Sequence, residues 1–349
     1  MTRIVFEDVS KIYGDRPRQV QEAMALLRQN VPSDEIFART GCRVGLRHIS
    51  LEIPSGGIFC VIGLSGSGKS TLVRHINRLI EPSCGRIQAC DTDVTALDAR
   101  GLREFRRARV SMVFQHFGLL PHLTVMQNTC FGLRVRGLSA KEQRERACHW
   151  LREMELADMA DSYPEQLSGG MRQRVGLARA LTADTDIILM DEAFSALDPL
   201  IRIRLQDTVL ALQQRLGKTI VFITHDIDEA LKMGNRLAIL NAGELVQVGT
   251  PQELLDHPAN DYVAEFMRTA RQPGNARCWN RPTSPSALGR SIVVSAPSVD
   301  SCNAVANAIA QARGGRPSSR PTATTIRAYS RCWDVNDPDA STPCGFAST

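Results

Sequence analysis

The chain of 349 residues lacks several features that would each have placed it in another class. No run approaches the ~18 apolar residues that cross a bilayer, so no membrane span is expected. The first residues, MTRIVFEDVSK, contain no apolar signal core, which predicts a cytoplasmic protein. Ten cysteines are scattered without a single C-x-x-C spacing, which favours free reduced thiols over disulfides or a zinc site.

Lysine and glutamate are both missing from the end of the chain. Residues 271–349 hold nine Arg and four Asp, and this stretch accounts for the whole net charge of +5. The preceding 270 residues hold 33 basic and 33 acidic residues and are therefore neutral, which argues against nucleic acid as a partner. Pro, Ser, Arg, Ala and Thr dominate residues 271–349, so a tail of low order is expected, with a helical pattern only at 301–313.

The start of the chain predicts an antiparallel β-region with a helical insertion. Residues 4–9 and 44–51 alternate apolar and polar side chains, which is typical of antiparallel strands. Residues 19–30 show helical spacing, and a second helix is expected to begin with Ser33 as its N-cap.

Short apolar runs further along the chain predict a parallel sheet. They lie at residues 58–62, 187–190 and 219–223. Because these runs are β-branched and do not alternate, they are expected to be buried on both faces. The helix after the first run is expected to face a core through Leu72, Val73, Ile76, Leu79 and Ile80. Asn241-Ala242-Gly243 predicts a β-hairpin near the end of this region.

A glycine-rich turn between the first of these runs and its helix carries the strongest motif. It reads GLSGSGKST and consists of Gly63, Leu64, Ser65, Gly66, Ser67, Gly68, Lys69, Ser70 and Thr71. This fits the P-loop pattern G-x-x-x-x-G-K-[ST], in the strand–loop–helix context that the motif needs. Its backbone N–H groups can wrap a β-phosphate, Lys69 can reach the β- and γ-phosphates, and the Ser70 hydroxyl can bind Mg²⁺. The motif predicts a site for the phosphates of a nucleotide, with Mg²⁺.

Polar side chains follow the other expected strands at the edge where a parallel sheet binds ligands. Asp191 is predicted to hold Mg²⁺ through water, and Glu192 to accept the proton of an attacking water. The amide of Gln115 can touch both the metal and that water. The His225 imidazole can donate to the γ-phosphate, whereas the other six histidines have no such placement.

Two further features suggest contacts with a nucleotide. Tyr13 in KIYGD is expected to be exposed by its Gly neighbour and to stack on an adenine ring; a core aromatic of the antiparallel sheet is the alternative. Ser168, Gly169 and Gly170 precede a helical pattern, and a helix N-terminus with free backbone N–H groups is a second site for an anion.

Taken in order, the P-loop, Gln115, LSGGMRQR, LMDEAFSALD and THD resemble the ATP-binding subunit of an ABC transporter over residues 1–270. The stretches GLSGSGKSTLVRHINRLIEP, SYPEQLSGGMRQRVGLARAL, MDEAFSALDPLIR and GTPQELLDHPANDYV are similar to the glycine betaine/proline importers of the quaternary-amine group. The helical insertion before the P-loop is also typical of that group. Its longer members carry paired CBS domains after the ATPase, and residues 271–349 show no such repeat.

The resemblance implies a P-loop α/β core with an antiparallel β-subdomain and a helical subdomain at about residues 115–185. It implies two copies paired head-to-tail around two ATP, with Ser168, Gly169, Gly170 and Gln173 contacting the ATP of the other protomer and Asp198 in the D-loop. It further implies separate permease subunits, a substrate-binding protein, and a peripheral position on the cytoplasmic face of the plasma membrane. The implied function is ATP hydrolysis that energises uptake of an osmolyte such as glycine betaine, proline betaine, choline or proline.

Other functions are weighed against this one. An importer ATPase for another small solute and a non-hydrolysing ATP-dependent scaffold both stay open, although Glu192 argues against the scaffold. An ABC ATPase of the DNA-repair type would contain a long coiled coil, and a translation-associated ABC protein would contain two cassettes. A GTPase would contain an N-K-x-D motif. The sequence shows none of these features. Within HFGLLPHLTV, four apolar side chains are expected either to form a permease docking groove or to pack inside the helical subdomain; they are Phe117, Leu119, Leu120 and Leu123.

Overall fold

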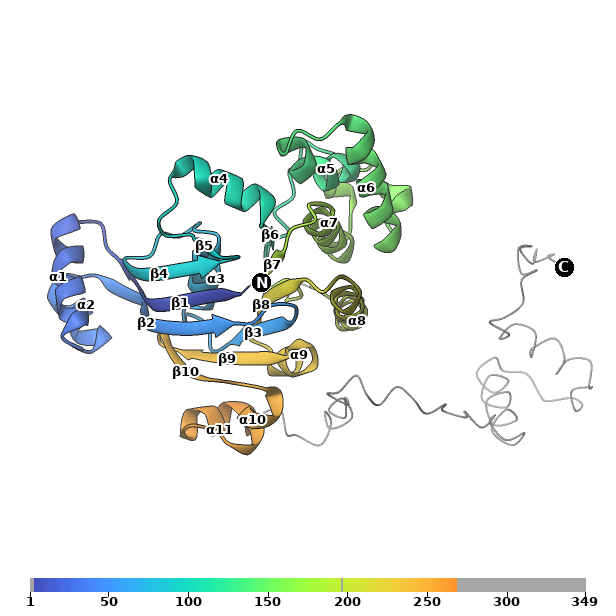
Figure 1. Ribbon diagram of the computed structural model, residues 1–349. Coiled ribbons are helices and arrows are strands. Elements are labelled where there is room, and N and C mark those ends of the chain that lie inside the picture. Colours follow the sequence, from blue (N-terminus) through green and yellow to red (C-terminus); the bar gives the residue numbers. More distant parts are fainter. Residues whose placement is uncertain (1–2, 196, 269–349) are drawn as a thin grey trace, which may run out of the picture. The chain divides into compact units, whose positions relative to one another are not determined.

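The computed structural model describes residues 3–195 and 197–268 (Figure 1). The expectations for residues 271–349, including the helical pattern at 301–313, lie outside the described residues. The strands are β1 (Ile4–Tyr13), β2 (Arg43–Ile53), β3 (Ile58–Ile62), β4 (Cys84–Ala89), β5 (Thr92–Asp93), β6 (Val110–Val113), β7 (Ile187–Asp191), β8 (Thr219–Ile223), β9 (Arg236–Asn241) and β10 (Glu244–Gly249). The helices are α1 (Pro17–Arg28), α2 (Ser33–Thr40), α3 (Lys69–Ile76), α4 (Ala99–Ala108), α5 (Val125–Val135), α6 (Ala140–Glu153), α7 (Gly169–Thr182), α8 (Pro199–Leu216), α9 (Ile227–Met233), α10 (Pro251–Asp256) and α11 (Asp261–Arg268).

Two sheets organise the chain. A four-stranded sheet of order β2-β1-β4-β5 is antiparallel, as the alternating pattern predicts. A six-stranded sheet has the order β10-β9-β3-β8-β7-β6, in which only β10 runs antiparallel to its neighbour. The three unalternating apolar runs are β3, β7 and β8, and every residue in them is buried. The predictions for these strands and for the β9–β10 hairpin are confirmed.

The six-stranded sheet divides the core into two layers. Successive side chains of a strand point to opposite faces. In β3, Cys60 and Val61 therefore belong to different hydrophobic clusters, one on each face of the sheet. Cys60 packs with residues of α7 and α8, whereas Val61 packs with α3 and the antiparallel sheet. The sheet is therefore covered on both faces, which keeps its strand ends fixed for a binding site.

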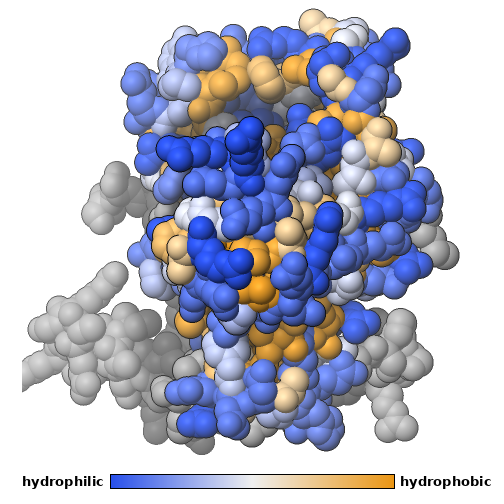
Figure 2. All heavy atoms as spheres, turned by 90° about the vertical axis from the view of Figure 1, so that its left-hand side faces the viewer, coloured by the Kyte–Doolittle hydropathy of each residue, from blue (hydrophilic) through white to orange (hydrophobic). Residues whose placement is uncertain are grey.

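The helical insertion between β1 and β2 has its own small core, built by Ala23, Leu26, Leu27 and Ile36. The expectation that Ser33 caps α2 is wrong, because Ser33 is the first helical residue and Pro32 occupies the cap without a side-chain hydrogen bond. Figure 2 looks onto the side of the molecule that carries α1 and α2, where apolar patches lie among mainly hydrophilic side chains.

Helix α3 is shorter than its apolar pattern predicts. It ends at Ile76, and Leu79 is 49% exposed instead of facing the core. The chain turns at Arg78, whose φ of 51° is left-handed and incompatible with a continuing helix. Arg106 of α4 fixes this turn by donating to the carbonyl oxygens of Asn77 (2.7 Å) and Arg78 (2.6 Å).

Helices α5, α6 and α7 lie between β6 and β7 and form the green group in Figure 1. Their starts follow from local sequence. Thr124 and Ser139 each form a capping box with the residue three positions on, and Ser168 caps α7 by accepting from the backbone N–H of Met171. No helix among residues 3–195 and 197–268 is long and apolar enough to cross a membrane.

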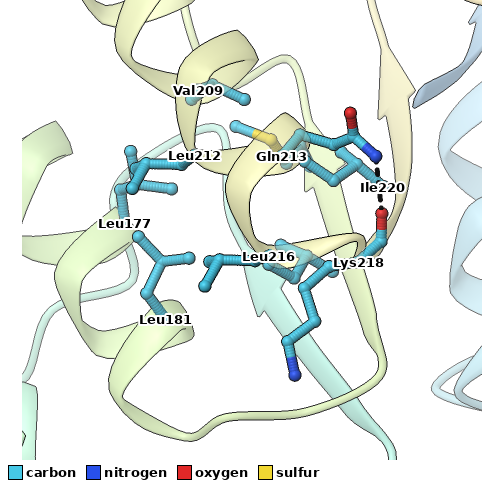
Figure 3. Close-up of a pocket in the computed structure, with 10 residues that line it drawn as sticks. Leu177, Leu181, Val209, Leu212, Gln213, Leu216, Lys218 and Ile220 are labelled. Carbon is cyan, nitrogen blue, oxygen red and sulfur yellow. Dashed lines mark hydrogen bonds between the residues drawn. The ribbon is translucent and has the colours of Figure 1, made fainter. Parts of the chain in front are cut away.

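The interior between α7, α8 and the sheet is closely packed. One cavity of about 10 Å³ is lined by Leu177, Leu181, Ile188, Met190, Val209, Leu212, Gln213, Leu216, Lys218 and Ile220 (Figure 3). Gln213 crosses its edge and donates to the carbonyl oxygen of Lys218 at 3.1 Å. A space of this size holds at most about one water molecule, so it is far too small for a nucleotide.

Candidate functional site

The P-loop runs from β3 to α3 and fits tightly against neighbouring backbone. A Cβ atom at Gly63 would lie 2.2 Å from the carbonyl oxygen of Leu240. Gly68 has a φ of 97°, and a Cβ there would lie 2.8 Å from the carbonyl oxygen of Gly45. Both positions therefore require glycine, and the loop presents its backbone instead of side chains to whatever binds above it.

Lys69 starts α3 and folds back under the loop. Its side chain is largely buried, and its Nζ donates to the carbonyl oxygens of Gly63 (2.9 Å) and Leu64 (2.8 Å). Burial lowers the pKa of Lys69, while the nearby carboxylates of Glu192 and Asp191 raise it. The buried Ser67 hydroxyl has no hydrogen-bond partner in the described part of the chain. A buried polar atom without a partner fits a loop that receives phosphate oxygens.

Asp191 ends β7 and is almost completely buried, with 1% exposure. Its Oδ1 accepts from the Ser70 hydroxyl at 2.9 Å, and its Oδ2 accepts from Arg74 Nε (3.2 Å) and Nη2 (2.9 Å). Sequence reasoning missed Arg74, although Ser70 and Arg74 are four residues apart on one helix face and so reach the same partner. The arginine neutralises the carboxylate and leaves Oδ1 turned toward the P-loop.

Replacing Arg74 by alanine is expected to destabilise the nucleotide-free protein. The substitution leaves the buried Asp191 carboxylate with the Ser70 hydroxyl as its remaining hydrogen-bond donor, so a loss of about 1–3 kcal/mol in the free energy of unfolding is expected. Urea unfolding measures this loss. Arg100→Ala is the control, because its ion pair with Glu104 is exposed and such pairs contribute about 0–1 kcal/mol. Equal stability of both variants would contradict the assigned role of Arg74.

Three polar side chains meet where β6, β7 and β8 end. The Gln115 side-chain nitrogen donates to Glu192 Oε2 at 3.0 Å, and His225 Nδ1 lies 3.4 Å from the same oxygen. Glu192 has a φ of 47°, a left-handed backbone that is uncommon outside glycine and often found at functional sites. The structure therefore brings together the P-loop, Asp191, Glu192, Gln115 and His225, as the strand-end argument predicts.

The donor set at these strand ends suits magnesium. Within the described residues no group of three or more His, Cys, Asp or Glu could hold a metal alone. The available atoms are the Ser70 hydroxyl, the Asp191 carboxylate and the amide oxygen of Gln115, whose nitrogen is already bound to Glu192. Mg²⁺ prefers a few protein oxygens completed by water and substrate phosphates, so the residues fit this ion.

Tyr13 lies at the exposed end of β1. The residue is 41% exposed, and its hydroxyl is 3.1 Å from the Thr71 hydroxyl of the P-loop. Lys11 Nζ is 5.2 Å from the ring centre on the same strand. The side chain is thus outside the core, beside the P-loop, and its stacking on adenine stays a prediction.

The second predicted anion site belongs to a different part of the chain. Ser168 is exposed at the start of α7, and in the described residues no hydrogen bond joins Ser168, Gly169 or Gly170 to the P-loop. Gln173, by contrast, is 2% exposed, and its two amide atoms are buried with no hydrogen-bond partner among residues 3–195 and 197–268. Asp198 is exposed and caps α8 by accepting from the backbone N–H of Leu200 at 3.0 Å. The predicted roles of these residues across an interface stay predictions.

The loop after Gln115 is neither fully exposed nor fully buried. Phe117, Leu119, Leu120 and Leu123 are all half-buried, and Leu119 packs on the core. Asn128, fully buried in α5, holds this loop by donating to the carbonyl oxygens of Leu120 (3.0 Å) and Leu123 (2.9 Å). Arg179 of α7 donates to the carbonyl oxygen of Gly118 at 2.6 Å. The loop is a fixed surface of the helical region.

A glycine-rich loop opposite carboxylates at the ends of parallel strands defines a P-loop nucleotide-binding protein. The family model for ABC transporters matches residues 46–195. The glycine betaine/proline betaine transport system ATP-binding protein ProV of Escherichia coli is 51% identical over 266 residues, which are 76% of this chain and 66% of that protein. The trimethylamine N-oxide transport system ATP-binding protein TmoW of Pelagibacter ubique is 43% identical over 74% of this chain and 75% of its own length.

A solved ATP-binding cassette, a dimer in a post-hydrolysis state with ADP and Pi bound, is 31% identical with a TM-score of 0.61. The match covers 71% of this chain and 98% of the cassette. The chain belongs to the family of ABC transporter ATP-binding proteins. It matches slightly less than two thirds of the length of the Escherichia coli relative.

Proposed function

We propose that the protein is the ATP-hydrolysing subunit of an ABC importer for a quaternary amine such as glycine betaine, proline betaine or choline, or for proline. The main support for this class of substrate is the 51% identity to a glycine betaine/proline betaine transport protein. Glu192, which accepts a hydrogen bond from Gln115 and lies 3.4 Å from His225 Nδ1 beside the P-loop, supports hydrolysis.

The roles of the residues follow from their positions. Backbone N–H groups of the P-loop bind the phosphates, and Lys69 exchanges its carbonyl acceptors for phosphate oxygens. Bound Mg²⁺ supplies positive charge that stabilises the phosphates in the transition state, and Ser70, Asp191 and Gln115 are the residues to hold it. Glu192 accepts the proton of the attacking water, Gln115 orients that water, and His225 donates to the γ-phosphate. Tyr13 stacks on the adenine.

The proposed assembly contains two copies of this chain. Ser168, Gly169, Gly170 and Gln173 of one copy contact the ATP held by the P-loop of the other, and Asp198 lies at their interface. Permease subunits dock on the fixed loop at residues 116–123, with a substrate-binding protein outside the membrane. The protein is then peripheral at the cytoplasmic face of the plasma membrane.

Phosphate release followed by reconstitution tests this function. Purified protein is expected to release phosphate from ATP only with Mg²⁺, and vesicles that also contain a permease of the glycine betaine importer group are expected to take up glycine betaine. Uptake of trimethylamine N-oxide instead would support the alternative of another small solute, because relatives such as TmoW are 43% identical. Binding of ATP without any phosphate release would support a non-hydrolysing scaffold.

A further inference from the structure

A cluster of buried and partly buried polar side chains surrounds the turn that holds His225. At its centre is Arg202 of α8, which is one turn beyond Asp198. Its Nη2 donates to the carbonyl oxygen of Leu197 at 3.3 Å, and its Nη1 donates to Asp226 Oδ2 at 3.4 Å. Its Nε is buried and lies 3.6 Å from Glu229 Oε1 as an ion pair. One guanidinium thus touches the segment after Glu192 and the segment after His225.

The residues on either side of His225 belong to the same cluster. The Thr224 hydroxyl donates to Glu229 Oε2 at 2.6 Å and accepts from the backbone N–H of Asp226 at 2.9 Å. Glu229 is 5% exposed and also accepts from the Gln206 amide at 3.1 Å. The backbone of His225 is therefore held from both sides, while its side chain stays 58% exposed.

The other end of the cluster reaches an exposed surface. The Leu197 carbonyl that accepts from Arg202 directly precedes Asp198, the exposed cap of α8. Turns from Glu192 to Ser195 and from Phe194 to Leu197 connect this point to Glu192. Arginine suits the position because its planar fork carries five donors, whereas lysine has a single charged nitrogen.

We propose that Arg202 is a positioning residue that ties the turn holding His225 to Leu197, directly before Asp198, so that a contact at Asp198 sets the position of His225. The inference rests on the proposed function, because Asp198 is placed there at the interface with a second copy. Arg202 contacts neither the P-loop nor Glu192 in the described residues. It therefore acts on the rate of hydrolysis and not on nucleotide binding.

The experiment measures binding and turnover separately in full-length variants. Arg202→Ala is expected to lower kcat by about 10- to 100-fold, the effect of a small misplacement of a reacting group, with Kd for Mg²⁺-ATP changed less than about twofold. The kcat of Arg202→Lys is expected to be close to that of Arg202→Ala, because a single nitrogen cannot bind both segments. Arg204→Ala is the matched control, since Arg204 is an exposed arginine on the same helix.

A second variant separates positioning from stability. Arg202→Ala leaves the buried Glu229 carboxylate without its cation, so the double variant Arg202→Ala/Glu229→Gln is expected to recover thermal stability but not kcat. The positioning role is overturned if the double variant recovers kcat together with stability. It is also overturned if the wild-type protein hydrolyses ATP and Arg202→Ala has the same kcat as Arg204→Ala. A wild-type protein that binds ATP without releasing phosphate would overturn the proposed function and this inference with it.

Discussion

Glu192→Gln is expected to slow ATP hydrolysis by about 10²- to 10⁴-fold, the usual contribution of a positioned general base. The amide has the shape of the carboxylate but cannot accept a proton from water. Glu192 contacts Gln115 and His225 and makes no hydrogen bond to the P-loop in the described part of the chain, so ATP binding should be nearly unchanged. The variant is then expected to accumulate as an ATP-bound dimer, which size-exclusion chromatography with Mg²⁺-ATP detects.

The control for this experiment is Glu165→Gln, which changes an exposed carboxylate near the start of α7. It should leave turnover within about twofold of wild type, because exposed substitutions have small effects. An unchanged rate in Glu192→Gln would show that another group takes the proton.

The second large effect concerns the two predicted anion sites. Lys69→Ala is expected to abolish nucleotide binding at the P-loop of its own protomer, because it removes the buried cation that reaches the phosphates. Ser168→Arg is expected to disable the site completed across the interface by filling the space that the γ-phosphate needs. Each variant alone forms a homodimer with two defective sites.

Mixing the two variants distinguishes a shared site from a site within one chain. In a head-to-tail heterodimer one site carries both lesions, and the other joins an intact P-loop to an intact Ser168-Gly169-Gly170. The mixture is expected to trap about one nucleotide per heterodimer, measured with labelled ATP after separation of the species by two affinity tags. If Ser168 served the P-loop of its own chain, every site would carry a lesion, and trapping at the level of the parents would exclude the head-to-tail arrangement.

The parallel core was predictable because its signals are local. The runs at β3, β7 and β8 are apolar and β-branched, and the polar residues Asp191 and His225 stand directly at or after their ends. The carboxyl ends of parallel strands lie at one edge of the sheet. Gln115, Glu192 and His225 could therefore be predicted to lie close together without knowledge of the strand order.

Other features depend on contacts between distant parts of the chain. Leu79 continues the apolar spacing of α3, yet Arg106 stabilises a turn that ends the helix before it. The sequence left two alternatives for Phe117 and Leu120, and their half-buried position depends on the buried Asn128 and the half-buried Arg179, which hold their loop in place. The partners of Arg74 and Arg202 are likewise distant in sequence, so only the folded chain shows what these arginines bind.

The insertion of α5, α6 and α7 between two adjacent strands has a consequence for local unfolding. β6 and β7 are parallel neighbours, so the chain leaves the sheet at the carboxyl end of β6 and returns at the opposite edge, where β7 begins. Opening of α5 and α6 breaks no strand pairing. Helices α5 and α6 pack on α7, which in turn packs on β6. Regions with fewer buried contacts open at lower free energy, so amide hydrogens of α5 and α6 should exchange with solvent before those of β3, β7 and β8. The loop at residues 116–123 is fixed only while α5 is folded, because Asn128 of α5 supplies its hydrogen bonds, whereas the P-loop and its strand ends stay folded when α5 opens.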